Sequence, residues 1–462
     1  MKPKQLLFLS AIFALLVLAV VLRQLQRPPE LTTEEYAPLD FSFDESRIGK
    51  IEIYKPKGAD EETQVSLVKE ETGWKISTLW NARADVDKVE QFLTQIKHAK
   101  GEIRAKDQSL FEDFGIRDDE ALHVKLSDLS ENELLHLLIG TKKADDRSLF
   151  IRKNDSEVVY VTNANLYGQM GVYGNPDTEP PKSDYWVSTQ LAHYDTDSVK
   201  RIEKVRFEKG VEIVTARVAL TIDPYDSTKR EWKFERSGLP FAIDPEKIKQ
   251  FLESAKTWVA KDVVDSKAKD YGFSSPLWRL SIVQDGREPI ILTAAPYDSE
   301  ADAYPIQVST EPVVFQLSKY YFENLDIDDS KFFRDNPLQV EPDQVEKLVI
   351  HTPKQEMSFE PKQKTWEGLT NYLNDLKTFR VDRMLFDARE KKKVGPEGEN
   401  WIKIQLVGKA AQFLDVGELI TKDTKTYAAS IRGTDHPFAI DDSMFQKLFG
   451  NLDRLATPED KG

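Results

Sequence analysis

The chain contains no cysteine, and this absence narrows its chemistry. Without cysteine it forms no disulfide, has no thiol to carry a lipid at a membrane, and cannot build a thiolate zinc site. The absence of cysteine fits an oxidising or a reducing compartment equally well. The histidines are few and scattered, and no two have the i, i+4 spacing of a zinc-protease helix: His98, His123, His136, His193, His351 and His436. We therefore predict no metal site and no cofactor.

Catalytic signatures are also missing. The sequence has neither a Gly-x-Ser-x-Gly nucleophile elbow nor a phosphate-binding glycine loop. Asp113-Phe114-Gly115 matches a kinase triplet, but the other kinase motifs are absent. Asp326 to Ser330 is acidic, yet Lys331 and Pro337 stand where a calcium loop needs glycine and glutamate, so a solvated acidic turn is predicted. We expect no catalytic residues and no enzymatic activity; a carboxylate-dependent hydrolase is the alternative.

The chain has fewer basic than acidic residues. The first 27 residues hold four of the 64 basic residues and none of the 79 acidic residues. The remainder therefore carries 60 basic against 79 acidic side chains, a formal charge of −19. A surface of this sign repels phosphate backbones and anionic lipid headgroups, which argues against nucleic acid as a partner.

One long apolar run stands near the start of the chain. Leu6 to Leu22 is interrupted only by Ser10, and about 20 residues suffice to cross a bilayer. A cleaved signal peptide is the alternative, but Val20-Val21-Leu22-Arg23 lacks the small residues of a cleavage site. We predict a cytoplasmic stub and single-pass anchor at 1–27 in the inner membrane, with the bulk of the chain periplasmic. A proline- and acid-rich stalk is predicted at 28–40.

Three stretches beyond the anchor repeat one pattern of a polar residue, an aromatic, leucine, two variable residues, an apolar residue and lysine. They begin at Gln91, Gln250 and Asn371. Apolar residues at spacings of three and four predict an amphipathic helix in each. Asp85 and Asp244 are natural N-caps for the first two helices. Each helix is followed by an apolar or aromatic residue and a glycine: Phe114-Gly115, Tyr271-Gly272 and Val394-Gly395.

Alternating apolar positions predict strands before and after each helix. A tryptophan marks the third strand of each copy, at Trp74, Trp232 and, more weakly, Trp366. Helices inserted among hairpins, without βαβ alternation, favour an α+β fold. We thus predict a transmembrane helix followed by three tandem repeats of a mixed or antiparallel sheet with packed helices. The predicted ranges are 41–170, 192–326 and 338–455 for the repeats, 171–191 and 327–337 for linkers, and 456–462 for a tail.

Aromatic residues supply the only candidate contact positions. Those at matched places in the repeats are best explained as core. Trp80, Trp258, Tyr320 and Tyr321 have no such explanation, and we interpret them as possible contacts for a ligand or a protein partner.

The pattern as a whole resembles a known family. A leading membrane helix, Trp-x-Ile or Trp-x-Phe strands, an Asp-capped helix with Phe-Leu, and an aromatic-glycine turn are similar to bacterial proteins with the domain of unknown function numbered 4340. The resemblance covers about 41–455. It implies an envelope protein encoded near permease, ATPase and auxiliary components of gliding-motility-type ABC transporters, and it supplies no catalytic residues.

Together these observations predict a membrane-anchored, non-enzymatic accessory or scaffold subunit of an envelope ABC-transporter-type assembly. Its partners would be the permease, the ATPase and auxiliary proteins. The alternative is a periplasmic module that binds glycan or lipid.

Overall fold

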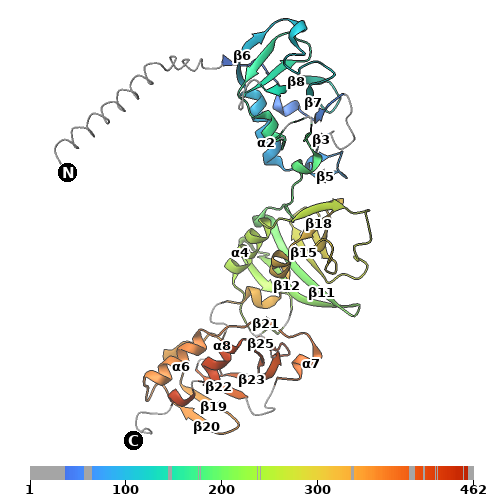
Figure 1. Ribbon diagram of the computed structural model, residues 1–462. Helices are drawn as coiled ribbons and strands as arrows, with labels where there is room; N and C mark the ends of the chain where they lie inside the picture. Colours follow the sequence, from blue (N-terminus) through green and yellow to red (C-terminus); the bar gives the residue numbers. More distant parts are fainter. Residues whose placement is uncertain are drawn as a thin grey trace, which may run out of the picture. The chain divides into compact units, whose positions relative to one another are not determined.

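The computed structural model describes residues 37–455 except 57–64, 144–147, 175, 177, 237, 240, 335–337, 395–400, 409–410, 422, 424 and 451. The chain divides into two compact units, Met1–Ser188 and Thr189–Gly462. The first unit contains one β-sheet, and the second contains two (Figure 1).

Each sheet is built from consecutive strands. The first contains β1 (Ala37–Pro38), β2 (Lys50–Tyr54), β3 (Val65–Glu70), β4 (Gly73–Ile76), β5 (Ala82–Arg83), β6 (Lys100–Ala105), β7 (Leu122–Ser127), β8 (Glu133–Lys143), β9 (Leu149–Lys153) and β10 (Val159–Thr162). The second contains β11 (Val199–Glu208), β12 (Val211–Asp223), β13 (Asp226–Phe234), β14 (Asp262–Asp265), β15 (Trp278–Gln284), β16 (Ile290–Ala294), β17 (Tyr304–Val308) and β18 (Val313–Leu317). The third contains β19 (Lys347–His351), β20 (Glu356–Phe359), β21 (Arg383–Met384), β22 (Ile402–Val407), β23 (Ala411–Thr421), β24 (Thr426–Ile431) and β25 (Phe438–Ile440).

The three sheets share one strand order. Apart from β1 and β5, the outermost strands of the first sheet, each sheet begins with the strand that follows the main helix, continues through the last four strands in reverse, and ends with the strands that precede the helix. This gives β6-β10-β9-β8-β7-β2-β3-β4, β14-β18-β17-β16-β15-β11-β12-β13 and β21-β25-β24-β23-β22-β19-β20. Every described pairing between these strands is antiparallel. The α+β class and the repetition of one antiparallel unit are therefore confirmed.

The main helix of each repeat forms where the aromatic-leucine pattern predicts it. These helices are α2 (Val86–Lys97), α4 (Pro245–Lys256) and α6 (Glu367–Lys377). Asp85 caps α2 by accepting hydrogen bonds from two backbone amides, and Asp244 caps α4 in the same way from one. The pattern's aromatic residues are buried, at Phe92, Phe251 and Tyr372.

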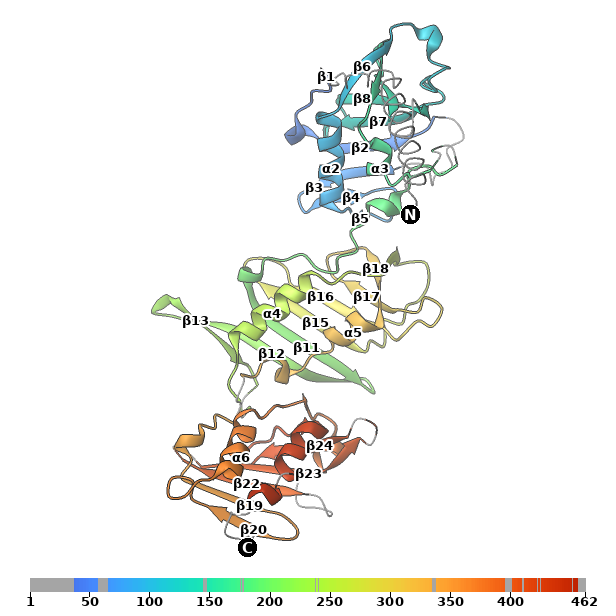
Figure 2. The same cartoon turned by 60° about the vertical axis from the view of Figure 1, so that its left-hand side comes forward.

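Shorter helices follow the last strand of each repeat: α3 (Leu166–Gln169), α5 (Lys319–Leu325) and α8 (Asp442–Phe445). A further short helix, α7 (Ala388–Lys391), follows β21. Figure 2 shows α4 and α5 lying across one face of the second sheet. In two repeats the short helix is held by a stacked ring pair, Tyr304 on Phe322 at 3.6 Å between centroids and Tyr427 on Phe445 at 3.7 Å.

The third repeat differs at the start of its main helix. A weak third strand was predicted at Trp366, but Trp366 is the N-cap residue of α6 and makes no side-chain capping bond. Because Trp366 lies only six positions before Tyr372, the chain has no room for a strand before the helix. The third sheet therefore ends at β20.

Both segments predicted as linkers contain buried turns, and we correct that prediction. Residues 183–188 and 329–334, here called the closing segments, fold back on the main helix of the preceding repeat. Trp186 and Phe332 are both 0% exposed. They pack edge-on against the helix aromatics Phe92 and Phe251, at 5.5 and 5.7 Å between ring centroids. Composition alone suggested loops because these short turns have no strand or helix periodicity.

The backbone contacts of the two closing segments are equivalent. The N-cap amide of Asp85 donates to the Trp186 carbonyl, and that of Asp244 donates to the Phe332 carbonyl, both at 2.7 Å. The residue before each N-cap forms an antiparallel bridge with the residue after each buried aromatic. These pairs are Ala84 with Val187 and Ile243 with Phe333. Since both bonds use a helix-end amide that has no partner inside the helix, each closing segment completes a helix N-terminus.

The third repeat is closed by its own C-terminal turns. The Tyr372 hydroxyl of α6 donates to the Leu448 carbonyl at 3.1 Å, and Leu452 and Leu455 are buried. These residues belong to a π-helical turn, Gln446–Gly450, and a 3-10 helix, Leu452–Leu455. The C-terminal turns thus cover α6 on the side that bears the helix aromatic.

The glycine turns are confirmed where they are described. Gly115 has φ of 61° and Gly272 has φ of 83°, a region that glycine enters without strain. Gly395 of the third repeat lies outside the described residues.

The predicted anchor at 1–27 and the tail at 456–462 lie outside the described residues. In the part of the chain that the structure describes, no helix combines the length and the apolar character needed to cross a bilayer. The end of the predicted stalk is not free, because Ala37–Pro38 pairs with β6 as the edge strand β1.

A test of the closing contact is the change Phe332→Ala. We expect it to lower the free energy of unfolding of the unit that contains α4 by about 3–5 kcal/mol, because it leaves a cavity beside Phe251. Urea unfolding followed by circular dichroism measures this loss. Tyr225→Ala is the matched control, since Tyr225 is 98% exposed, and it should change stability by less than about 0.5 kcal/mol. Equal effects of the two changes would contradict a closing role.

Candidate functional site

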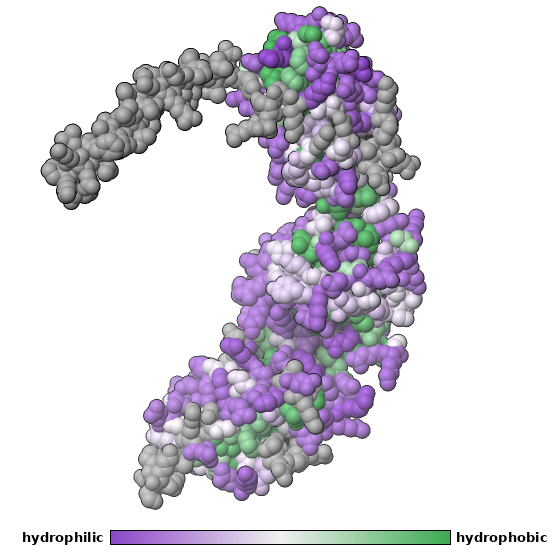
Figure 3. All heavy atoms as spheres, viewed as in Figure 1, coloured by the Kyte–Doolittle hydropathy of each residue, from purple (hydrophilic) through white to green (hydrophobic). Residues whose placement is uncertain are grey.

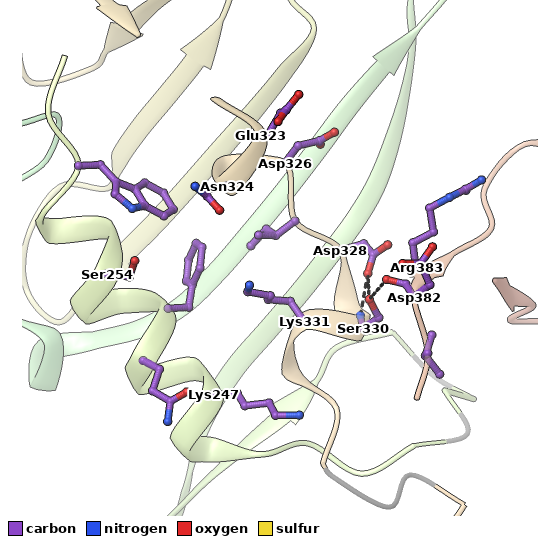
Figure 4. Close-up of a pocket in the computed structure, with 15 residues that line it drawn as sticks. Lys247, Ser254, Glu323, Asn324, Asp326, Asp328, Ser330, Lys331, Asp382 and Arg383 are labelled. Carbon is purple, nitrogen blue, oxygen red and sulfur yellow. Dashed lines mark hydrogen bonds between the residues drawn. The ribbon is translucent and has the colours of Figure 1, made fainter. Parts of the chain in front are cut away.

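A pocket with a volume of about 640 Å³ lies in the second compact unit. Its walls come from α4, the end of α5, the second closing segment with the residues before it, and the start of β21 (Figure 4). The lining residues are Lys247, Gln250, Phe251, Ser254, Trp258, Glu323, Asn324, Asp326, Ile327, Asp328, Ser330, Lys331, Val381, Asp382 and Arg383.

Helical spacing sets one wall of the pocket. Lys247, Gln250, Phe251 and Ser254 fall at i, i+3, i+4 and i+7 on α4, so they share one face of that helix. Trp258 follows two residues after the helix ends and packs edge-on against Phe251, at 5.9 Å between centroids. Phe251, Trp258 and Ile327 are each about nine-tenths or more buried, so they form an apolar base and present little open ring face.

Several polar groups of the pocket already have partners. The Lys247 ammonium donates to the Phe333 carbonyl at 2.7 Å. The Arg383 guanidinium binds both carboxylate oxygens of Glu390, at 3.1 and 2.7 Å. The charges of Lys247 and Arg383 are therefore already used in contacts within the protein.

Other side chains of the pocket are uncommitted. Gln250, Ser254, Lys331 and Asp382 have no side-chain hydrogen bond or ion pair within the described ranges of the chain. Figure 4 shows the Lys331 ammonium turned toward the middle of the pocket and Ser254 facing it from α4. Burial raises the pKa of Asp382 above its usual value. The pocket therefore offers an amide, a hydroxyl, an ammonium and a carboxyl to a bound molecule.

A buried lysine lies next to this pocket. Lys204 of β11 is 0% exposed, and its ammonium donates to the Leu325 carbonyl at 2.6 Å and to Asp326 at 3.2 Å. It also lies 4.0 Å from the ring centroid of Trp278, a cation–π distance. Burial lowers the pKa of Lys204 to about 7, although the carboxylate of Asp326 opposes that shift.

Asp326 is shared between two basic residues. Its second carboxylate oxygen accepts from Arg206 at 3.1 Å. Burial alone would raise the pKa of Asp326, but Lys204 and Arg206 hold it below the usual value. The charged end of α5 is thereby tied to the sheet beneath it.

The predicted solvated acidic turn at Asp326 to Ser330 is wrong, because its middle is buried. Asp329 is 0% exposed, accepts from the Arg217 amide at 3.0 Å, and lies 3.3 Å from the Arg236 guanidinium as an ion pair without an aligned hydrogen bond. Burial raises its pKa to about 6, with Arg236 opposing the shift. This burial could not be predicted from local sequence, since Arg217 and Arg236 lie about 100 residues away along the chain.

Asp328 joins the second repeat to the third. One carboxylate oxygen accepts from the Ser330 amide at 2.8 Å and from the Ser330 hydroxyl at 2.5 Å, and the other accepts from the Met384 amide of β21 at 2.8 Å. Burial raises the pKa of Asp328. These carboxylates serve backbone amides and arginines, and no group of three potential metal ligands occurs among the residues that the structure describes.

The four aromatic residues predicted as contacts do not converge on one place. Trp80 belongs to the first compact unit, is 42% exposed, and has φ of 52° in the turn between β4 and β5. Trp258 lines the pocket of the second unit. Tyr320 is 70% exposed and packs edge-on against Tyr321 at 5.3 Å, one turn of α5 from Asn324. Their role in binding stays a prediction.

Two of the scattered histidines meet in the first unit. His123 of β7 and His136 of β8 place ring nitrogens 2.9 Å apart, and Tyr54 stacks on His123 at 5.0 Å between centroids. Burial lowers the pKa of both histidines. The sequence separates them by 13 residues, and only the pairing of the two strands brings them together.

Fold and site together define a tandem-repeat α+β protein with a polar pocket that is lined by residues of its second and third repeats. Residues 74–276 and 236–398 each match the sequence model of the family described as Domain of unknown function (DUF4340). The chain belongs to that family. Neither the curated proteins nor the solved structures include a match to this chain.

Stability should respond to Asp329 between about pH 4 and pH 6. The folded-state pKa of about 6 lies above the usual value of 3.8, so in this window the folded state binds more protons. Stability contributed by this group is therefore lost as pH rises. Asp329→Asn removes the titration but keeps an oxygen for the Arg217 amide. Urea midpoints should show the variant gaining on the wild type by about 1–3 kcal/mol across the window.

Asp226→Asn is the control for this measurement. Asp226 is only partly buried, and its hydrogen bonds to Thr228 lower its pKa, so its removal should not reproduce the gain with rising pH. A constant difference between Asp329→Asn and the wild type from pH 4 to pH 6 would contradict the raised pKa.

Proposed function

We propose that this protein is a non-enzymatic accessory or scaffold subunit of an envelope ABC-transporter-type assembly. Residues 1–27 would anchor it in the inner membrane, and the repeats would present surface to a permease, an ATPase and auxiliary proteins from the periplasmic side. The observation that carries this proposal is the threefold use of one strand order. Repeat proteins commonly act by offering extended binding surface.

The use of the buried charges supports the same proposal. Asp328 and Asp329 bind backbone amides and Arg236, and Asp328 connects the closing segment to β21 of the next repeat. Groups committed in this way stabilise an arrangement of repeats. Their partners are fixed within the protein, so their burial has a structural explanation.

The surface agrees with a role in an aqueous compartment. On the face shown in Figure 3, most described residues are hydrophilic, with apolar residues in smaller areas. The most exposed large apolar residues are well separated in sequence: Leu129, Tyr173, Val211, Tyr225 and Tyr320. Transient partner interfaces are about as polar as the remaining surface, so such a surface suits reversible assembly.

A second candidate function is a periplasmic module that binds glycan or lipid. The pocket beside α4 favours it, because Trp258, one of the aromatic residues singled out in the sequence, forms part of its base. The uncommitted side chains around that base supply both donors and acceptors.

Co-purification tests the scaffold proposal. A C-terminally tagged full-length chain, produced from its own locus and extracted in mild detergent, should recover a permease and an ATPase of the ABC type in near-stoichiometric amounts. Mass spectrometry with quantitation measures the recovery. A tagged fragment of residues 1–40 is the control, and it should recover neither protein because it lacks the repeats. Recovery of neither by the full-length chain, or equal recovery by the fragment, would sink the proposal.

A further inference from the structure

The closing segment beside the pocket differs from its counterpart in the first repeat at the residue before the buried aromatic. The bridges Ala84–Val187 and Ile243–Phe333 align the two closing segments. In this alignment Tyr185 corresponds to Lys331, and each directly precedes the buried aromatic of its segment.

In the first repeat, Tyr185 fills the corresponding space. Its ring lies against Gly171, just after α3, where an added Cβ would come within 2.5 Å of the ring. The Lys88 ammonium lies 4.6 Å from the centroid of the same ring and donates to the Tyr185 carbonyl at 2.6 Å. Tyr185 thus connects α2 with the turn after α3.

In the second repeat the position equivalent to Tyr185 carries a lysine. Lys247, the counterpart of Lys88, donates to the Phe333 carbonyl instead. The uncommitted Lys331 takes the place of the tyrosine, and the space between α4 and the end of α5 stays open as the pocket of about 640 Å³.

The polar side chains around the pocket favour some classes of ligand over others. Lys331 and Asp382 contribute one uncommitted charge of each sign, and Gln250 and Ser254 contribute neutral donors and acceptors. An acyl chain would leave all four groups without water or partners, which is costly for polar groups. A ligand of a single charge sign would face an opposing charge. Uncharged hydroxyl groups can accept from the ammonium and donate to the carboxylate at the same time.

We propose that this pocket is a binding site for a short neutral oligosaccharide. The ligand's C–H groups rest on the edges of Phe251 and Trp258, and its hydroxyls bind Gln250, Ser254, Lys331 and Asp382. The volume suits a ligand of about two or three sugar rings. This assignment rests on the second candidate function, the binding module, and is independent of the scaffold proposal.

Ligand-observed saturation-transfer NMR on the full-length protein tests the site. The probes are cellotriose, maltotriose and chitotriose, with decanoate as the acyl probe. At least one trisaccharide should show saturation transfer with the wild type, and decanoate should not. Lys331→Tyr restores the residue type of the first repeat and should weaken trisaccharide binding at least tenfold by filling the pocket.

Ser254→Trp fills the pocket independently from an exposed position of α4 and should cause the same loss. Lys249→Trp is the matched control, because Lys249 is exposed on α4 but does not line the pocket, and it should bind as the wild type does. Circular dichroism of each variant shows whether it folds.

Three results would overturn the assignment. Trisaccharide signals that persist unchanged in Lys331→Tyr and Ser254→Trp would place glycan binding elsewhere on the protein. Transfer to decanoate that both variants abolish would make the pocket an acyl site. No transfer to any probe would remove both the pocket assignment and the binding-module candidate, and it would leave the scaffold proposal to the co-purification experiment.

Discussion

The architecture depends on one repeated contact, in which the amide of a helix N-cap residue binds the carbonyl of a buried aromatic residue. Asp85 binds Trp186 in this way, and Asp244 binds Phe332. The aspartate side chain accepts hydrogen bonds from backbone amides in the first turn of the helix, and the aspartate's own backbone amide donates to the closing segment. One residue thus caps the helix and binds the closing segment. The segment that leaves each of these repeats is consequently part of that repeat's core.

The family's matches cross the boundaries between repeats. The match to residues 74–276 begins in the third strand of one repeat and ends after the glycine turn of the next, and the match to 236–398 begins just after the third strand of the second repeat. Each match therefore spans two main helices and has a closing segment inside it. The closing segment packs on the main helix that precedes it. Each matched range therefore includes a main helix, the residues that complete its N-terminus, and the strands that follow those residues.

The sequence predicted the elements that are specified by residues close together in the chain. Asp85 and Asp244, followed by apolar residues at spacings of three and four, were sufficient to predict α2 and α4. The closing segments were missed because a single turn has no period, although an aromatic residue followed by an apolar one, Trp186-Val187 and Phe332-Phe333, was a usable sign. Burial of Lys204 and Asp329 was beyond prediction, since their partners come from strands and turns far along the chain.

The pocket illustrates how a repeated scaffold acquires a site. The chain that leads into the second closing segment is held by Lys204 and Thr215, which donate to the carbonyls of Leu325 and Ile327, and the Arg217 amide donates to Asp329 at the start of the segment. These bonds fix the backbone, so the side chain at position 331 can change without loss of the closing contact. A tyrosine at the equivalent position of the first repeat bridges toward α3, whereas a lysine leaves the space open and adds a charge. The hydrogen bonds that hold this part of the backbone are thus separate from the side chain at position 331, so the two closing segments keep the same backbone contact with different side chains.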